Sequence, residues 1–210
     1  MTRLAGTRTY RLSQKVDKYI MYYDSILIRK LTSLEISDLK EELANNDSLW
    51  IDHVFDLKYT ALKDGKSIHL QWCDNELVVT REKWESFSKT KNILKSITGS
   101  NTIGRVYWHR LLPGEKINAH NDANLPFVLS NKLVHRYQIY LDIDTNVEIF
   151  FDNRIIDVNQ ISNSIIDFPL KSMHYYKNNS NSIVYLLVFD DVGTPSRIRT
   201  SECRNQNPMP

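Results

Sequence analysis

The sequence predicts a mainly β protein (α+β) with helices in its N-terminal half. Two observations support this fold class. From Gly104 onward, short runs rich in β-branched and aromatic residues follow one another, and turn residues separate them. No helical pattern lies between these runs. Several strands at such spacing favour a sandwich or barrel over a parallel α/β sheet.

The N-terminal half carries the predicted helices. Residues 19–31 have the composition of one or two strands, and a helix is expected next, capped by Ser33. Its apolar stripe consists of Leu34, Ile36, Leu39 and Leu43. Shorter strands are expected within 49–57 and 67–72. The strongest helix candidate spans 80–100, where Gly99 suits a C-terminal stop.

The C-terminal half supplies the predicted β core. Its strand-like runs are 105–112, 135–143, 147–151, 164–168 and 182–189. We therefore expect a single domain over residues 1–192, made of an N-terminal flank (about 1–102) and a β core (about 103–192). Residues 193–210 are polar and rich in turn formers, which predicts a mobile tail.

Composition excludes several classes of protein. The formal net charge is only +2 and the charges are interspersed, so neither a nucleic-acid footprint nor a membrane-surface patch is indicated. No run approaches the roughly 20 apolar residues that span a bilayer. The first residues lack the apolar core of a signal peptide. Two distant cysteines form no disulfide framework, which suits a reducing cytoplasm.

A candidate metal site lies in the segment RLLPGEKINAHNDANLP, residues 110–126. In an extended chain, residues two apart face the same way, so His120 and Asp122 can aim at one point. His174, which precedes the last strand, is the best-placed third ligand. Two imidazoles and one carboxylate on one face of an octahedral ion leave three positions open, as in non-haem Fe(II) oxygenases.

The segment from about Ile103 to Val192 resembles the aspartyl/asparaginyl β-hydroxylase family of Fe(II)/2-oxoglutarate-dependent oxygenases. The matching stretches are RVYWHRLLPGEKINAHND, HRYQIYL and MHYYKNNSNSIVYLLVFD. The resemblance implies a double-stranded β-helix core, the jelly-roll or cupin-like fold. It further implies that His120, Asp122 and His174 are catalytic residues that hold Fe(II), with 2-oxoglutarate as co-substrate and O₂ as oxidant.

The resemblance also implies a co-substrate site on the strand HRYQIYL. Alternation places Arg136, Gln138 and Tyr140 on one face of this strand, and Tyr137, Ile139 and Leu141 on the other. In the family, an Arg-x-His pair here holds one carboxylate of 2-oxoglutarate. Arg136 matches the arginine, and Gln138 replaces the histidine while keeping a hydrogen-bond donor.

The last strand departs from the family pattern. Asp190 is in frame, but the arginine that binds the far carboxylate is replaced by Val184. Three alternatives follow. Another cation takes over, with Arg110, Lys171 and Lys177 as candidates. Alternatively, Arg136 binds the co-substrate in a changed orientation. In the third, the protein has lost 2-oxoglutarate and either uses another ligand or is inactive. Full activity with the arginine simply omitted is disfavoured, because a buried carboxylate without a partner costs several kcal/mol.

The sequence therefore predicts a hydroxylase that acts on an amino acid, or on Asp or Asn side chains of a peptide or protein. The alternative is a non-catalytic or 2-oxoglutarate-independent cupin-like protein that binds a metal or ligand. Of the neighbours His109 and Arg110, one is expected to face the interior because adjacent strand residues alternate. The sequence does not decide the oligomeric state.

Overall fold

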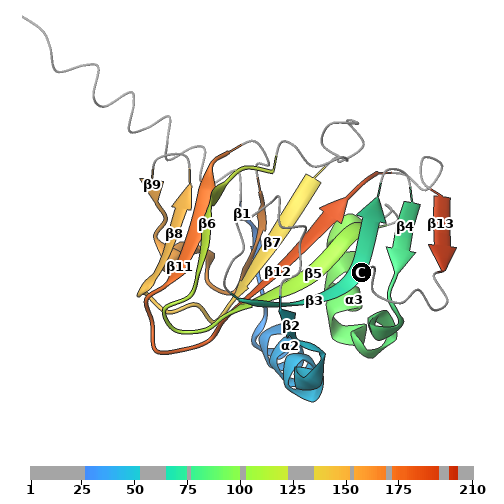
Figure 1. Cartoon of the computed structure of the whole chain (residues 1–210), viewed down its shortest axis with the longest axis horizontal. Coiled ribbons are helices and arrows are strands. Elements are labelled where there is room, and N and C mark those ends of the chain that lie inside the picture. The colour runs from blue at the N-terminus through green and yellow to red at the C-terminus, as the bar shows by residue number, and fades with distance from the viewer. Residues whose placement is uncertain are drawn as a thin grey trace, which may run out of the picture.

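Two β-sheets face each other in the computed structural model (Figure 1), which describes residues 27–52, 65–74, 77–99, 103–122, 135–151, 154–168, 172–193 and 199–202. The large sheet follows the order β1 (Leu27–Lys30), β10 (Ser164–Asp167), β7 (His135–Leu141), β12 (Val184–Asp191), β5 (Ile103–Leu111), β3 (Lys66–Asp74), β4 (Leu77–Thr80) and β13 (Arg199–Glu202), and β2 (Ile51–Asp52) pairs with β3. The small sheet follows the order β6 (Lys116–His120), β11 (His174–Asn178), β8 (Val147–Phe151) and β9 (Arg154–Ile155). This is the predicted jelly-roll arrangement of a mainly β protein.

Alternation along the strands sends side chains into two separate apolar layers. One layer lies between the large sheet and the helices, and from β7 it takes Tyr137, Ile139 and Leu141. The other layer lies between the two sheets, and it takes Tyr140. The inner layer also contains Ile117, Ile149 and Tyr176 from the small sheet together with Val184, Leu186 and Val188 from β12. The predicted two-faced character of residues 135–141 is therefore confirmed.

Helices α2 (Ser33–Asn45) and α3 (Ser88–Thr98) lie together against the outer face of the large sheet, below it in Figure 1. In the part of the chain that the structure describes, the other helical segments are α5 (Val158–Ile161) and two short 3₁₀ helices at Asp47–Leu49 and Glu82–Ser86. Among the described residues, no helix combines the length and the apolar character needed to cross a membrane.

The N-terminus of α3 is held by a residue of α2. The buried carboxylate of Glu42 accepts hydrogen bonds from the backbone N–H groups of Lys89 and Thr90, at 2.7 and 3.0 Å. These N–H groups have no partner within their own helix, so an acidic side chain satisfies them. The predicted helix over 80–100 is instead a 3₁₀ helix at Glu82–Ser86 followed by α3, which begins at Ser88. The predicted stop at Gly99 is confirmed.

Two further expectations need correction. The cap of α2 is Thr32 rather than Ser33, because Glu35 then occupies the position whose side chain completes a capping box with Thr32. In the predicted mobile tail, Arg199–Glu202 forms β13, which pairs in parallel with β4. Pairing at a sheet edge uses backbone groups and needs no apolar side chains, so the composition of the tail did not reveal it. The rest of the tail from residue 203 lies outside the described residues.

Stability should depend on pH through Glu35, whose pKa is lowered to about 2, chiefly by the hydrogen-bonded guanidinium of Arg29. A pKa that is lower in the folded state stabilises the fold above the ordinary pKa, and this contribution is lost as pH falls from about 4.5 toward 2. We expect Glu35→Gln to cost less than about 1 kcal/mol near neutral pH, since the pair is partly exposed. Urea unfolding at several pH values measures this. The difference from wild type should shrink in acid, and a constant difference would contradict the assignment.

Candidate metal centre

The first candidate ligands come together because two neighbouring strands place them opposite each other. At the Pro113–Gly114 turn, Gly114 has φ +85° and the N–H of Glu115 donates to the carbonyl of Leu112 at 3.0 Å. This is the pattern of a type II turn, and it carries the chain from β5 into β6 of the small sheet. There β6 pairs antiparallel with β11, and His120 stands opposite His174. Their ring centroids are 4.2 Å apart.

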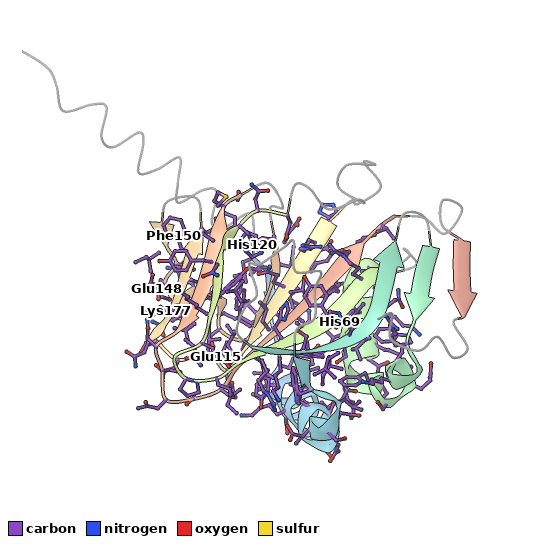
Figure 2. All side chains as sticks on the ribbon, in the orientation of Figure 1. His69, Glu115, His120, Glu148, Phe150 and Lys177 are labelled. Carbon is purple, nitrogen blue, oxygen red and sulfur yellow. The ribbon has the colours of Figure 1, made fainter. Side chains whose placement is uncertain are left out.

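Asp122 completes the cluster just after the end of β6. One ligand atom from each of His120, Asp122 and His174 lies within 4.8 Å of the others. Nε2 of each imidazole is 3.9 Å from a carboxylate oxygen of Asp122. The sequence predicted these three residues as one group, and the fold brings them together. In Figure 2, His120 lies at the upper end of β6, far from Glu115 below.

Both imidazoles are oriented in the same way. Nδ1 of His120 contacts the carbonyl oxygen of Asn118 at 2.8 Å, and Nδ1 of His174 contacts that of Ser172 at 2.9 Å. A carbonyl only accepts, so Nδ1 is the donor in both rings. In the neutral ring the lone pair then resides on Nε2, the atom that points toward Asp122. Such a backbone contact is how proteins fix the tautomer of a metal-binding histidine.

Burial sets the charges of the cluster. Burial, followed by the neighbouring His120, lowers the pKa of His174 to about 4, so this ring is neutral at pH 7. Burial raises the pKa of Asp122 to about 6, which still leaves the carboxylate ionised at pH 7. The His174 side chain is only 2% exposed, while that of His120 is 25% exposed. The cluster is therefore closed on the β11 side and open to solvent near His120.

This donor set fits a divalent transition metal. Two nitrogen atoms and a carboxylate oxygen from one side of the ion are the ligands that non-haem Fe(II) sites use, and first-row ions such as Co(II) or Zn(II) accept the same donors. Ligand atoms of all three side chains converge on one place. Among the described residues, this is the group of histidine and acidic side chains that meets the geometry of a metal site.

A buried ionic row borders the cluster. Arg136 is 1% exposed and faces the interior. Its Nε and Nη2 donate to the two oxygens of Asp190 at 2.7 and 3.0 Å, and its Nη1 donates to Asp122. Nε of Arg105, on β5, donates to the same Asp190 at 3.0 Å. Burial raises the pKa of Asp190 to about 6, although the Arg105 guanidinium opposes this.

Gln138 lies two residues after Arg136 on the same inner face of β7, and it connects the large sheet with the small one. Its Oε1 accepts hydrogen bonds from the hydroxyls of Tyr140 and Tyr176, the latter at 3.0 Å. The two hydroxyl oxygens are 3.3 Å apart. Tyr176 stands two residues after His174 on β11, and the ring centroids of these two residues are 5.7 Å apart, so the bridge lies next to a metal-ligand candidate.

The structure corrects the expectation for Arg110. This side chain lies on the helix-facing side of β5, 4.7 Å above the ring of Trp50 and paired with Asp47 at 2.7 Å. Its neighbour His109 is the one that faces inward, where its Nδ1 lies 2.8 Å from the Ser67 hydroxyl. The expectation that one of these two neighbours faces the interior therefore holds, but alternation gives two faces without saying which is inside, so Arg110 was a wrong candidate for the co-substrate site.

Of the other candidates for the missing cation, Lys177 does not take its place. Val184 is buried in the inner apolar layer beside Leu186 and Val188. Lys177 is exposed, at the outer left of the small sheet in Figure 2 with Glu148 and Phe150. Lys171 lies outside the described residues. Arg105 was not predicted as a residue of the site. It lies four residues before His109 on β5, and strand residues an even number apart share a face, so Arg105 also points to the inner face.

Comparison with known proteins identifies the fold. No protein-family model matches the sequence, and no curated protein matches it. A solved prolyl hydroxylase from Trichoplax adhaerens, in complex with a peptide fragment of the hypoxia inducible factor oxygen degradation domain, superposes with a TM-score of 0.56 at 10% identity, covering 89% of this chain and 94% of that one. The chain has the jelly-roll fold of this hydroxylase.

Two further structures resemble this jelly roll less closely. A Pseudomonas putida prolyl-4-hydroxylase gives a TM-score of 0.49 at 12% identity and covers 80% of this chain and 89% of its own. An oxidoreductase of the 2OG-Fe(II) oxygenase family from Burkholderia pseudomallei gives 0.44 at 15% identity, with coverages of 75% and 83%.

Proposed function

We propose that the protein is an Fe(II)/2-oxoglutarate-dependent hydroxylase. The observation that carries this proposal is the convergence of Nε2 of His120, Nε2 of His174 and the Asp122 carboxylate at the end of the small sheet. In both imidazoles Nδ1 lies against a backbone carbonyl, which favours the tautomer that leaves Nε2 available to a metal. The jelly-roll fold supports the proposal, because oxygenases of this kind are built on it.

Each residue of the site has a proposed role. His120, Asp122 and His174 hold the metal, which when bound supplies the activation of O₂ and the oxidative decarboxylation of the 2-oxo acid to succinate. Arg136 and Gln138 orient a carboxylate of the co-substrate. A guanidinium has five N–H groups. Nε–H and one N–H of Nη2 donate to Asp190, and one N–H of Nη1 donates to Asp122. The second N–H groups of Nη1 and Nη2 are the proposed donors to the co-substrate carboxylate.

The proposed substrate is a side chain of a peptide or protein. The side of the cluster near His120 is the more exposed one, and this is where a large substrate can approach. The similar Trichoplax enzyme was solved with a peptide fragment, which supports this choice. Within this class, the sequence resemblance makes Asp and Asn side chains the first candidates, and a free amino acid is the smaller alternative.

The experiment is a turnover assay on anaerobically reconstituted protein. Fe(II), 2-oxoglutarate and O₂ are added with and without libraries of Asp-, Asn- and Pro-containing peptides. We expect succinate to form, and one peptide class to gain the mass of one oxygen atom. An iron-loaded protein that never consumes 2-oxoglutarate would contradict the proposal.

One observation favours a second candidate, a metal-binding jelly roll without 2-oxoglutarate chemistry. The inward positions of β12 at 184, 186 and 188 are all apolar, so this strand offers no cation to a second carboxylate. The same assay separates the two functions. Stable binding of the metal, together with no effect of 2-oxoglutarate on the bound ion, would favour this second candidate.

A further inference from the structure

Three charged side chains form a row across three adjacent strands of the large sheet, on its inner face. Arg105 belongs to β5, Asp190 to β12 and Arg136 to β7, and Asp190 stands directly opposite Arg136 in the strand register. Their exposed fractions are 5%, 1% and 1%. A buried ionic cluster is weak evidence for stability, because desolvation offsets its attraction. A role at the neighbouring site accounts better for its presence.

Arg136 links the row to the metal centre. The two oxygens of Asp190 accept hydrogen bonds from Nε and Nη2 of Arg136, and this bidentate contact fixes the plane of the guanidinium. The third nitrogen, Nη1, then points in a set direction, and it donates to Oδ2 of Asp122. Arg105 lies on β5, which flanks β12 on the side away from β7, and its Nε donates to Oδ2 of Asp190. The Asp190 carboxylate is therefore held from both neighbouring strands.

The backbone is also shaped around Asp190. A Cβ atom at Gly104 would lie 2.9 Å from Cγ1 of Val192 and 3.2 Å from Cβ of Asp190. A side chain at position 104 would therefore require Val192 and Asp190 to shift. The glycine, next to Arg105, keeps Asp190 within reach of both arginines.

We propose that Asp190 is a positioning residue for the metal centre, acting through Arg136 on the carboxylate of Asp122. Asp190 and Arg105 hold the Arg136 guanidinium, and Arg136 holds Asp122 in the direction of His120 and His174. This inference rests on the metal site of the proposed function. The ligand concerned is a divalent transition-metal ion.

The test is a titration with Co(II), whose visible spectrum reports its coordination. The wild type should bind one equivalent of Co(II) and show the visible absorption of the bound ion. His174→Ala should abolish this absorption. For Asp190→Asn we expect Co(II) affinity to fall about 10- to 100-fold, as when a group supporting a metal ligand is removed, with a changed spectrum of the bound ion. The matched control is Asp191→Asn, an equally buried neighbour whose Oδ1 accepts from the N–H of Gly193. It should leave the Co(II) affinity and spectrum unchanged.

Two further variants separate positioning from folding. The double variant Asp190→Asn with Arg105→Gln removes one charge of each sign, so the row keeps its charge balance. We expect it to fold and still to bind Co(II) as weakly as the single variant. Gly104→Ala keeps every charge but displaces Asp190, and it should weaken Co(II) binding as well.

The outcomes distinguish this inference from the proposed function. A wild type that binds no Co(II) overturns the metal site itself. A wild type that binds Co(II), together with a folded Asp190→Asn that binds it equally well with the same spectrum, overturns the positioning role alone. Recovery of wild-type affinity in the double variant also overturns it, because charge balance would then be the whole effect.

Discussion

Replacing His174 with alanine is expected to abolish metal binding and 2-oxoglutarate turnover together. Nε2 of His174 lies 3.9 Å from the Asp122 carboxylate, and its Nδ1 is held by the Ser172 carbonyl, so the ring is fixed in a ligating position. Removing a direct ligand should cost more affinity than the about 100-fold loss that follows removal of a supporting group. Iron content after anaerobic reconstitution and succinate formation are the two measurements.

A matched histidine controls this variant. His135 lies on β7, 45% exposed, with Nδ1 2.8 Å from the Asp167 carboxylate, and it has no contact with the metal cluster among the described residues. We expect His135→Ala to retain iron and turnover. Retention of stoichiometric iron by His174→Ala would sink the assignment of the three ligands.

The largest effect on stability is expected from Trp108→Ala. Trp108 is fully buried on the helix-facing side of β5, and its Nε1 donates to the Thr90 hydroxyl of α3 at 3.3 Å. Thr90 in turn donates to Glu42 of α2, so this one indole connects the sheet with both helices. Truncation of a buried tryptophan costs about 3–5 kcal/mol through lost contacts and the cavity left behind.

The conservative variant Trp108→Phe isolates the hydrogen bond from the packing. It keeps most of the apolar area and loses the Nε1 donor, so we expect a cost of about 1–3 kcal/mol, which includes the Thr90 group left with one partner fewer. Guanidinium unfolding followed by far-ultraviolet circular dichroism measures both variants. Equal losses for alanine and phenylalanine would show that packing against the helices is not the main contribution.

Local patterns predicted most of the core strands. Alternation along residues 135–141 assigned Arg136, Gln138 and Tyr140 to one face, because successive strand residues point to opposite faces. In the structure that face is the inner one, and the other face packs against the helices. The type II turn at Pro113–Gly114 likewise follows from local sequence, since glycine tolerates the φ of +85° at Gly114 without strain. These features depend on neighbours in the chain alone.

The ionic row and the facing of Arg110 were not predicted, and both depend on strand register. Asp190 meets Arg136 and Arg105 only because β12 lies between β7 and β5, an order that no local pattern reveals. Arg110 shares the helix-facing side of β5 with Trp108, and which side of β5 meets the helices depends on segments distant in sequence. The three proposed metal ligands were easier to find, since the spacing of His120 and Asp122 is itself local.

The central claim is that one iron ion and one 2-oxo acid bind together at His120, Asp122 and His174. The most direct measurement is anomalous X-ray diffraction at the iron edge from a crystal prepared anaerobically with Fe(II) and 2-oxoglutarate. We expect a single iron peak bound to Nε2 of both histidines and to the Asp122 carboxylate, with the 2-oxo acid on the same ion and a carboxylate near Arg136. An iron peak at other residues, or an iron at this site that never takes the 2-oxo acid from a saturating soak, would contradict the account.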